Sequence, residues 1–291
     1  MFGLFVFMAM LGFALLAPTD AMAWGPISHI VHGSTILGDL SALPAAVRNV
    51  LAAYPDHYLY GCVGADIIQA KAYTRSVATH CHRWPIAWTL VDGARTPKQR
   101  AFAWGYMTHL GADIISHNHF VPAQLVRSFD SRSAGHAYWE ARADALQRVR
   151  FSRSLREVLE GRYEECDELV DRVIRDTLFS FKTNKKIFDS LMAVSKLERW
   201  QAFMTTVNRR SRYTLTRPTV DRFNADAIAA AHDLLRRGRR SSTQERDPTG
   251  SDVLERATAL RRKLRVLKKN RRLPRGLEHE MAAELLPAEW S

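Results

Sequence analysis

The sequence predicts an all-α protein: a bundle-like domain of many helices, followed by a helical C-terminal extension. Apolar residues recur at helical spacing over long stretches, and no alternating pattern typical of strands continues for more than a few residues. The chain has 291 residues, of which 46% are hydrophobic, so it can bury a sizeable core. This composition is ordinary for a globular protein and argues against global disorder.

The N-terminus has the pattern of an export signal. Residues 2–17 are almost wholly apolar, and Ala21-Met22-Ala23 is a small-x-small cleavage site. We therefore expect a signal peptide at residues 1–23, with Trp24 as the first residue of a periplasmic or secreted protein. The positive charge that usually precedes the apolar run is missing apart from the initiator amine. An uncleaved membrane anchor is the alternative, although the run is short for a full span.

Proline and glycine mark several expected helix boundaries. Gly25-Pro26 suits a helix start, a second helix is expected near Pro44–Tyr54, and a third opens at Pro97. Later amphipathic stretches lie near Glu164–Ser195, Lys196–Val207, Val220–Arg237, Asp252–Asn270 and Gly276–Leu286. The polar, basic run RRGRRSSTQERDPTGS reads as a linker before the last helices.

The stretch from Ala101 to Pro122 carries the clearest chemical pattern. His109, Asp113 and His117 are spaced four residues apart, so on one continuous helix they share a face. Pro122 is the expected end of that helix. Two imidazoles and a carboxylate stacked in this way form the skeleton of a metal site. The alternative is an acid–histidine pair that caps the helix or lies on a wet surface.

Other potential ligands occur along the chain. His136 and Glu140 repeat the histidine–acid spacing on a second helix, and Asp66 follows a small, apolar, glycine-bearing turn. Other histidines with ligand potential are His29, His80, His82 and His119. Packing imidazoles and carboxylates together without a cation would cost much desolvation free energy, which a divalent ion would offset. The set contains almost no sulfur and suits zinc.

Taken in order, these residues resemble the trinuclear zinc site of the bacterial zinc-dependent phospholipases C, whose all-α fold is shared with single-strand-specific nucleases. The residues that carry the resemblance are Trp24, His29, Asp66, His80, His109, Asp113, His119, His136 and Glu140. The resemblance covers roughly residues 24–140. It implies an exported zinc-dependent phosphodiester hydrolase that converts phospholipid into diacylglycerol and a phosphorylated headgroup.

The resemblance also implies which residues would hold each zinc ion. The first ion would be bound by the amine and carbonyl of Trp24, with His29 and Asp113. The second would be bound by Asp66, His80, His109 and the bridging Asp113. The third would be bound by His119, His136 and Glu140. Because Trp24 needs a free amine for this role, it requires cleavage of the signal peptide. We further expect Asp66 to orient or deprotonate the attacking water.

Two positions stay open at this level. If the helix that carries His109 and Asp113 persists to residue 118, His117 faces the site. If the helix ends before that point, His119 does so instead, and His119 has the spacing of the family. His82 competes with His80 in the same way, although the distance from Asp66 along the sequence favours His80.

Charge is concentrated near the C-terminus. Residues 236–276 carry a net charge of +11 out of +12 for the whole chain. We therefore divide the chain into the signal peptide, a zinc-dependent phospholipase C-like helical domain at residues 24–235, and a basic helical extension at residues 236–291. The extension could bind an anionic membrane surface as an amphipathic helix, or it could be a solvated or disordered tail.

Two further functions remain open. The first is a single-strand nuclease or nucleotidase with the same zinc site, which the short Trp24–His29 gap and the basic extension favour. The second is a non-catalytic metal-binding protein that uses the extension to bind membrane or polymer. Three cysteines are too few for a disulfide framework, and we expect small buried thiols rather than a Cys62–Cys81 bridge.

Overall fold

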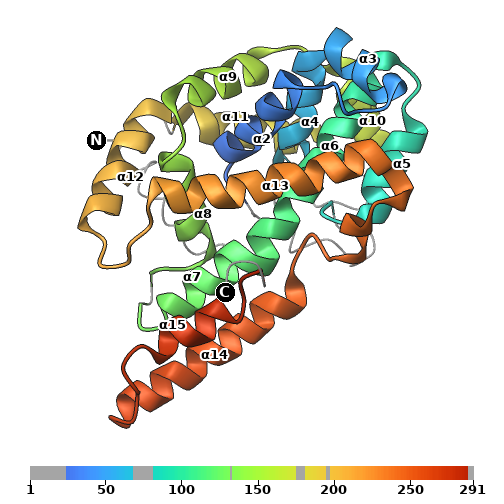
Figure 1. The fold of residues 1–291 in the computed structure, drawn as a ribbon. Helices are drawn as coiled ribbons and strands as arrows, with labels where there is room; N and C mark the ends of the chain where they lie inside the picture. Colours follow the sequence, from blue (N-terminus) through green and yellow to red (C-terminus); the bar gives the residue numbers. More distant parts are fainter. Residues whose placement is uncertain (1–23, 68–80, 132, 175–180, 195–196, 288–291) are drawn as a thin grey trace.

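The computed structural model describes residues 24–67, 81–131, 133–174, 181–194 and 197–287, and every regular element within these ranges is helical. This confirms the all-α prediction (Figure 1). The elements are α2 (Pro26–Gly38), α3 (Ala45–Ala53), α4 (Pro55–Ile67), α5 (Trp84–Gly93), α6 (Pro97–Ile115), the π-helix η3 (Ser116–Phe120), α7 (Val121–Arg127), α8 (His136–Ala145), α9 (Val149–Glu160), α10 (Glu164–Val173), α11 (Phe181–Val194), α12 (Leu197–Arg210), α13 (Arg217–Arg237), the 3-10 turns η4 (Gly238–Arg240) and η5 (Ser242–Glu245), α14 (Ser251–Lys269) and α15 (Leu277–Ala283).

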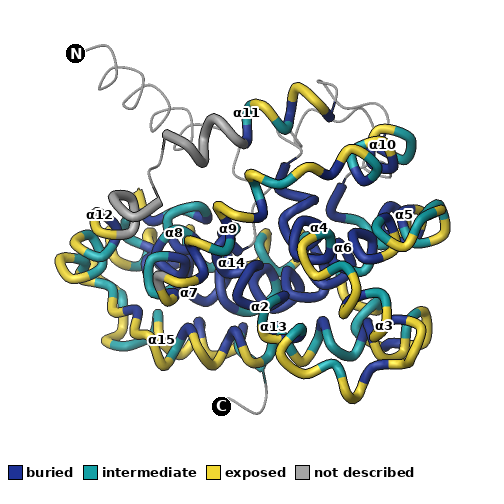
Figure 2. The backbone as a smooth tube through the Cα atoms, turned by 90° about the horizontal axis from the view of Figure 1, so that it is seen from above, coloured by how far each residue is buried: buried dark blue, intermediate teal, exposed yellow. Residues whose placement is uncertain are grey.

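Helix α6 lies at the centre of the molecule, between α4 and α13. Its residues are almost all buried, as are those of α4, and Figure 2 shows both helices in the dark-blue interior. The two helices approach very closely at a pair of glycines. A Cβ on Gly61 would lie 2.0 Å from the carbonyl oxygen of Phe102, and one on Gly105 would lie 2.0 Å from that of Tyr58. Only glycine permits this approach.

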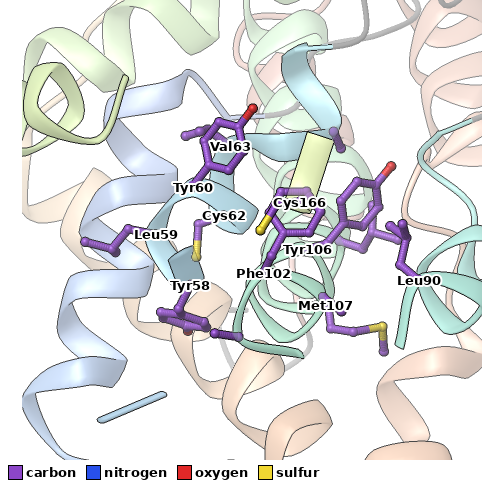
Figure 3. Packing of buried hydrophobic residues seen from close by; sticks show 14 of the residues in the cluster. Tyr58, Leu59, Tyr60, Cys62, Val63, Leu90, Phe102, Tyr106, Met107 and Cys166 are labelled. Carbon is purple, nitrogen blue, oxygen red and sulfur yellow. The ribbon is translucent and has the colours of Figure 1, made fainter. Parts of the chain in front are cut away.

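Around this contact the side chains form a continuous apolar cluster. Phe102, Tyr106 and Met107 of α6 pack with Tyr58 and Val63 of α4 (Figure 3). Cys62, Cys81 and Cys166 are buried free thiols, as predicted. The core thus fixes the register of α4 against α6, which matters because both helices carry site residues.

The end of α6, the helix that carries His109 and Asp113, differs from the prediction. The α-helical part of α6 ends at Ile115, five residues of π-helix follow, and α7 continues from Val121. Pro122 therefore does not end the helix, as the sequence suggested, but lies in the first turn of α7. Proline is tolerated there because its missing N–H is less costly in a first turn, and the wider π turn precedes it.

The basic C-terminal segment packs onto the domain. Ala257 and Leu264 of α14 and Ala282 of α15 form a third apolar cluster with Ala123 and Val126 of α7. In Figure 1, α14 and α15 lie together along the lower edge of the molecule, against α7. Residues 251–287 are therefore an ordered layer and not a disordered tail.

The segment expected to be a linker is also packed. It forms the two short turns η4 and η5, and Trp88 Nε1 donates a hydrogen bond to Gln244 Oε1 at 2.6 Å. Trp84 Nε1 donates to the carbonyl of Arg246 at 2.8 Å. These bonds tie the segment to α5, so residues 238–250 have a fixed path.

Two sequence expectations stay predictions. The signal peptide at residues 1–23 lies outside the described residues, and the domain boundary at residue 235 is untested. Among the helices in the described ranges, none is both long and apolar enough to cross a membrane.

Candidate metal centre

Four segments bring five ligand-type side chains into one buried group. His29 comes from α2, Asp66 from α4, His82 from the turn before α5, and His109 and Asp113 from α6. Each of the five is at most 1% exposed. We call them the five-residue group. Within it, His29, Asp66 and His109 offer ligand atoms within 4.8 Å of one another, and so do His82, His109 and Asp113.

The carboxylate of Asp113 lies at the centre of this group. Its oxygens are 3.1 Å from Nε2 of His109 and 3.3 Å from Nε2 of both His29 and His82. Asp66 lies further out, with its oxygens 3.7 to 3.9 Å from the same three nitrogens. Asp113 is therefore the carboxylate nearest to all three imidazoles, and Asp66 lies further from them.

The protonation of His109 is set by a carbonyl. Its Nδ1 lies 2.8 Å from the carbonyl oxygen of Cys62, so Nδ1 donates its proton there and Nε2 presents a lone pair. That Nε2 is 3.0 Å from Nε2 of His82. If both nitrogens present lone pairs beside the Asp113 carboxylate, the arrangement is repulsive unless a cation lies between them.

The unsatisfied hydrogen-bonding atoms of the five-residue group also point to a bound cation. Both carboxylate oxygens of Asp113 and both ring nitrogens of His29 are buried, and none of them has hydrogen-bond geometry with any residue in the described ranges. Buried polar atoms are nearly always satisfied, and a coordinated ion would satisfy these. The donor set, three imidazoles and two carboxylates without thiolate, fits zinc.

The charge states suit a metal site. Burial lowers the pKa of His29, and the nearby His109 lowers it further, against the opposing effect of Asp113. Burial alone would raise the pKa of Asp113, but its interactions with His109 and His29 outweigh burial and hold the pKa well below the usual range. A neutral imidazole and an ionised carboxylate are the forms that coordinate zinc.

A second group lies one turn further along, and we call it the three-residue group: His117 of η3 with His136 and Glu140 of α8. Nε2 of His136 is 2.7 Å from Oε1 of Glu140, and all three residues are buried. Burial raises the pKa of Glu140 well above its usual range, and His117 opposes this. A cation in the group would favour the ionised carboxylate.

The orientation of His117 depends on the segment before α14. Nδ1 of His117 lies 2.5 Å from the carbonyl oxygen of Pro248, so its Nε2 is presented to His136 and Glu140. Gly250, in the left-handed region at φ +57°, packs against the same residue: a Cβ there would lie 2.5 Å from the carbonyl oxygen of His117. The C-terminal segment thus orients one member of the three-residue group.

The structure brings most of the predicted ligands together, but not all. His117 joins His136 and Glu140, whereas Nδ1 of His119 lies 3.0 Å from the carbonyl oxygen of Leu285, toward α15. His119 is absent from both groups. His80 lies outside the described residues, and His82 occupies the position beside His109 that was expected for His80.

Trp24 is anchored beside the site through its side chain. The indole Nε1 donates a hydrogen bond to the carbonyl of Ala112 at 3.1 Å, and the ring stacks on Phe120 with centroids 5.1 Å apart. This fixes the chain next to α6, one residue before Asp113. The role of its backbone amine as a ligand stays a prediction.

Asp144 holds the start of α2 and with it the segment between Trp24 and His29. Its carboxylate accepts hydrogen bonds from the backbone N–H of Ile27 at 3.1 Å and of Ser28 at 2.9 Å, and from the Ser28 hydroxyl at 2.6 Å. A carboxylate at a helix N-terminus is also favoured by the helix dipole. Asp144 was not among the predicted site residues, although its spacing of four residues from Glu140 places both on one face of α8.

One comparison with known proteins finds a match. A family model for zinc-dependent phospholipase C matches residues 28–204, which include all eight residues of the two groups. No curated protein and no solved structure matches the chain.

Proposed function

The chain belongs to the zinc-dependent phospholipase C family, and from this membership and its two buried ligand groups we propose that it is an exported enzyme that hydrolyses phospholipids. The products would be diacylglycerol and a phosphorylated headgroup. The observation that carries the proposal is the convergence of eight buried histidine and carboxylate side chains from five helices and the turn before α5, within the range of the family match.

We propose that the five-residue group holds two zinc ions, with Asp113 between them, and that the three-residue group holds a third. The central position of Asp113, 3.1 to 3.3 Å from three imidazole nitrogens, supports a bridging role. When bound, zinc supplies a nucleophile at neutral pH and stabilises negative charge on the phosphoryl oxygens.

Asp66 is the candidate general base. Its oxygens lie 3.7 to 3.9 Å from the imidazole nitrogens, further than those of Asp113, so Asp66 is the carboxylate less closely approached by the three imidazoles. In the proposed step, the water oxygen forms a bond to phosphorus and Asp66 accepts the proton of the water. The bond from phosphorus to the glycerol oxygen breaks with its electron pair going to that oxygen, which takes a proton from solvent to give diacylglycerol.

Export and processing complete the proposed site. Cleavage after Ala23 would give Trp24 a free amine, and the anchored indole of Trp24 would keep that amine close to α2. Intact-mass analysis of the exported protein tests this: a chain beginning at Trp24 supports the proposal, and a chain that retains residues 1–23 contradicts it.

The decisive experiment replaces Asp66 with Asn, which keeps the size of the side chain and removes the base. Hydrolysis of phosphatidylcholine should fall by about 10²–10⁴-fold, while zinc content, measured by elemental analysis, stays close to that of the unmodified protein. Equal loss of zinc and activity contradicts the base role.

The substrate class is tested with the unmodified, zinc-loaded protein. Cleavage of single-stranded DNA instead of phospholipid would establish the nuclease alternative, and no hydrolysis of either would favour the binding protein.

A further inference from the structure

The outer face of α14 combines dense positive charge with exposed apolar side chains. Between Glu255 and Glu278 the chain contains ten Lys and Arg residues and no acid. Four of them are paired with other groups of the protein: Arg261 and Arg265 donate hydrogen bonds to carbonyls between Ser128 and Ala134, Lys268 pairs with Asp130, and Arg256 pairs with Glu284.

Six cations remain on the outside. They are all exposed, and no ion pair joins any of them to an acid within the described part of the chain: Arg262, Lys263, Lys269, Arg271, Arg272 and Arg275. We call these six residues the outer cations. Because they are not neutralised by the protein, they give this edge of the molecule a strong positive potential that a polyanionic partner would complement.

Apolar side chains lie among the outer cations. The side chain of Val266 is 53% exposed, and within the described ranges no other large hydrophobic side chain is exposed to this extent. Together with Ala259, Leu267 and the stems of Arg262 and Lys263 it lines a shallow hollow on this face. Long cationic side chains can extend sideways from such a strip and keep their charges in water while the apolar atoms are covered.

The turn after α14 adds a further cation where glycine is usually preferred. Arg271 has φ of 56°, in the left-handed region, and the N–H of Arg272 closes the helix end on the carbonyl of Leu267 at 2.9 Å. A side chain costs free energy in this conformation. Glycine would satisfy the turn with less strain, so Arg271 contributes charge rather than turn stability.

From these observations we infer that the outer face of α14 docks on the surface of an anionic lipid bilayer, with Val266 entering the interface between the outer cations. Such a mixture of basic and apolar residues on one helix face is typical of helices that lie on membranes. Nucleic acid is disfavoured as the partner, because residues 251–287 contain no Phe, Trp or Tyr on which bases could stack.

The docking face is joined rigidly to the metal centre. The carbonyl of Pro248 contacts His117, and α14 begins three residues later at Ser251 and extends over about 27 Å at 1.5 Å per residue. No flexible linker separates the two. The biological meaning of this docking rests on the proposed phospholipid substrate, whereas the binding itself does not require hydrolysis.

The test uses the full zinc-loaded chain carrying Asp66→Asn, so that lipid is not consumed, and measures co-sedimentation with vesicles of phosphatidylglycerol or phosphatidylcholine. We expect binding to phosphatidylglycerol that weakens with rising salt. Replacing Arg262, Lys263 and Lys269 together with Gln should lower the partition coefficient on the order of 100-fold, because each cation near an anionic surface contributes on the order of fivefold.

The matched control removes the same charge elsewhere. Replacing Arg48, Arg100 and Arg153 together with Gln removes three exposed cations on α3, α6 and α9, and it should leave vesicle binding nearly unchanged. Equal effects of the two triple variants would show a dependence on net charge alone and overturn the docking face.

Two single variants separate docking from structure. Arg271→Gly should lower vesicle binding by about fivefold without lowering the melting temperature. Val266→Ser should weaken vesicle binding more than binding to single-stranded DNA. Binding to single-stranded DNA but not to vesicles overturns the inference.

The outcomes also separate this inference from the proposed function. Vesicle binding through these residues, with no phospholipid hydrolysed by the chain that retains Asp66, would contradict the proposed function and leave the docking face standing. Hydrolysis of a short-chain soluble phospholipid without any vesicle binding would do the reverse.

Discussion

His117 and Pro248 are joined across 131 residues of sequence: Nδ1 of the histidine lies 2.5 Å from the carbonyl oxygen of the proline. The family match ends at residue 204, so the carbonyl that orients this histidine lies outside it. The basic C-terminal segment therefore has a structural role at the candidate metal centre, whatever it binds on its outer face. Deleting it would disturb both, which is why point variants are needed to separate them.

Zinc content should report the two groups separately. The unmodified protein should contain about three zinc ions per chain. His109→Ala should lose the ions of the five-residue group and keep that of the three-residue group, and His136→Ala should do the opposite. Elemental analysis of the purified, zinc-replete variants measures this. The control is His57→Gln, a half-buried histidine on α4 that belongs to neither group, and it should retain every ion. Identical losses in both Ala variants would show that the groups do not load independently.

The choice between His117 and His119 can be tested directly. His117→Ala should lose one zinc ion, because it removes a ligand of the three-residue group. His119→Ala should retain all zinc, since this side chain lies against the carbonyl of Leu285. If His119→Ala loses the ion and His117→Ala does not, the π-helical assignment of the ligand is wrong.

Gly250 should be irreplaceable for reasons beyond its backbone angle. Gly250→Ala meets the conformational cost of the left-handed region, about 1 kcal/mol, and in addition forces a Cβ to within 2.5 Å of the His117 carbonyl. We expect a loss of unfolding free energy and of zinc. Gly276→Ala is the control, because Gly276 is also left-handed and a Cβ there meets nothing within 4 Å. It should lose stability in thermal unfolding but keep its zinc, and equal zinc loss in both variants would contradict this account.

Attachment of α14 should weaken in acid. Burial opposes ionisation of Asp130, but Lys268, Tyr213 and Arg212 outweigh it, so the pKa of Asp130 lies below its usual range. A carboxyl whose pKa is lower in the folded state adds stability above its unfolded pKa, near 3.9, and that stability disappears as pH falls through the folded pKa. Asp130→Asn should therefore be less stable than the unmodified protein at pH 7 and should differ little from it at the acid end. Thermal unfolding from pH 7 to pH 3 measures the difference, and a constant gap over this range would contradict the assignment.

Much of the candidate site could be predicted from short-range patterns. His109 and Asp113, and likewise His136 and Glu140, lie one helical turn apart, and a spacing of four residues on a helix fixes their common face without any tertiary information. The all-α class follows in the same way from apolar periodicity. These predictions depend only on local geometry, and the structure confirms the fold class.

The remaining assignments depend on contacts that leave no local pattern. Whether His117 or His119 faces Glu140 depends on five residues of π-helix. A π-helix turns the side chains around the axis by a different angle per residue than an α-helix, and the spacing of residues in the sequence does not reveal this change. The orientation of His109 and of His117 depends on two backbone carbonyls, those of Cys62 and Pro248. Every residue has a backbone carbonyl, so residue type does not indicate which carbonyl will contact a given histidine. The sequence by itself thus determined the helices and the chemical types of the ligands, because these follow from local periodicity and donor chemistry. Only the tertiary structure decided which histidines converge and which helix face is left exposed, because both depend on the packing of distant segments against α6 and α7.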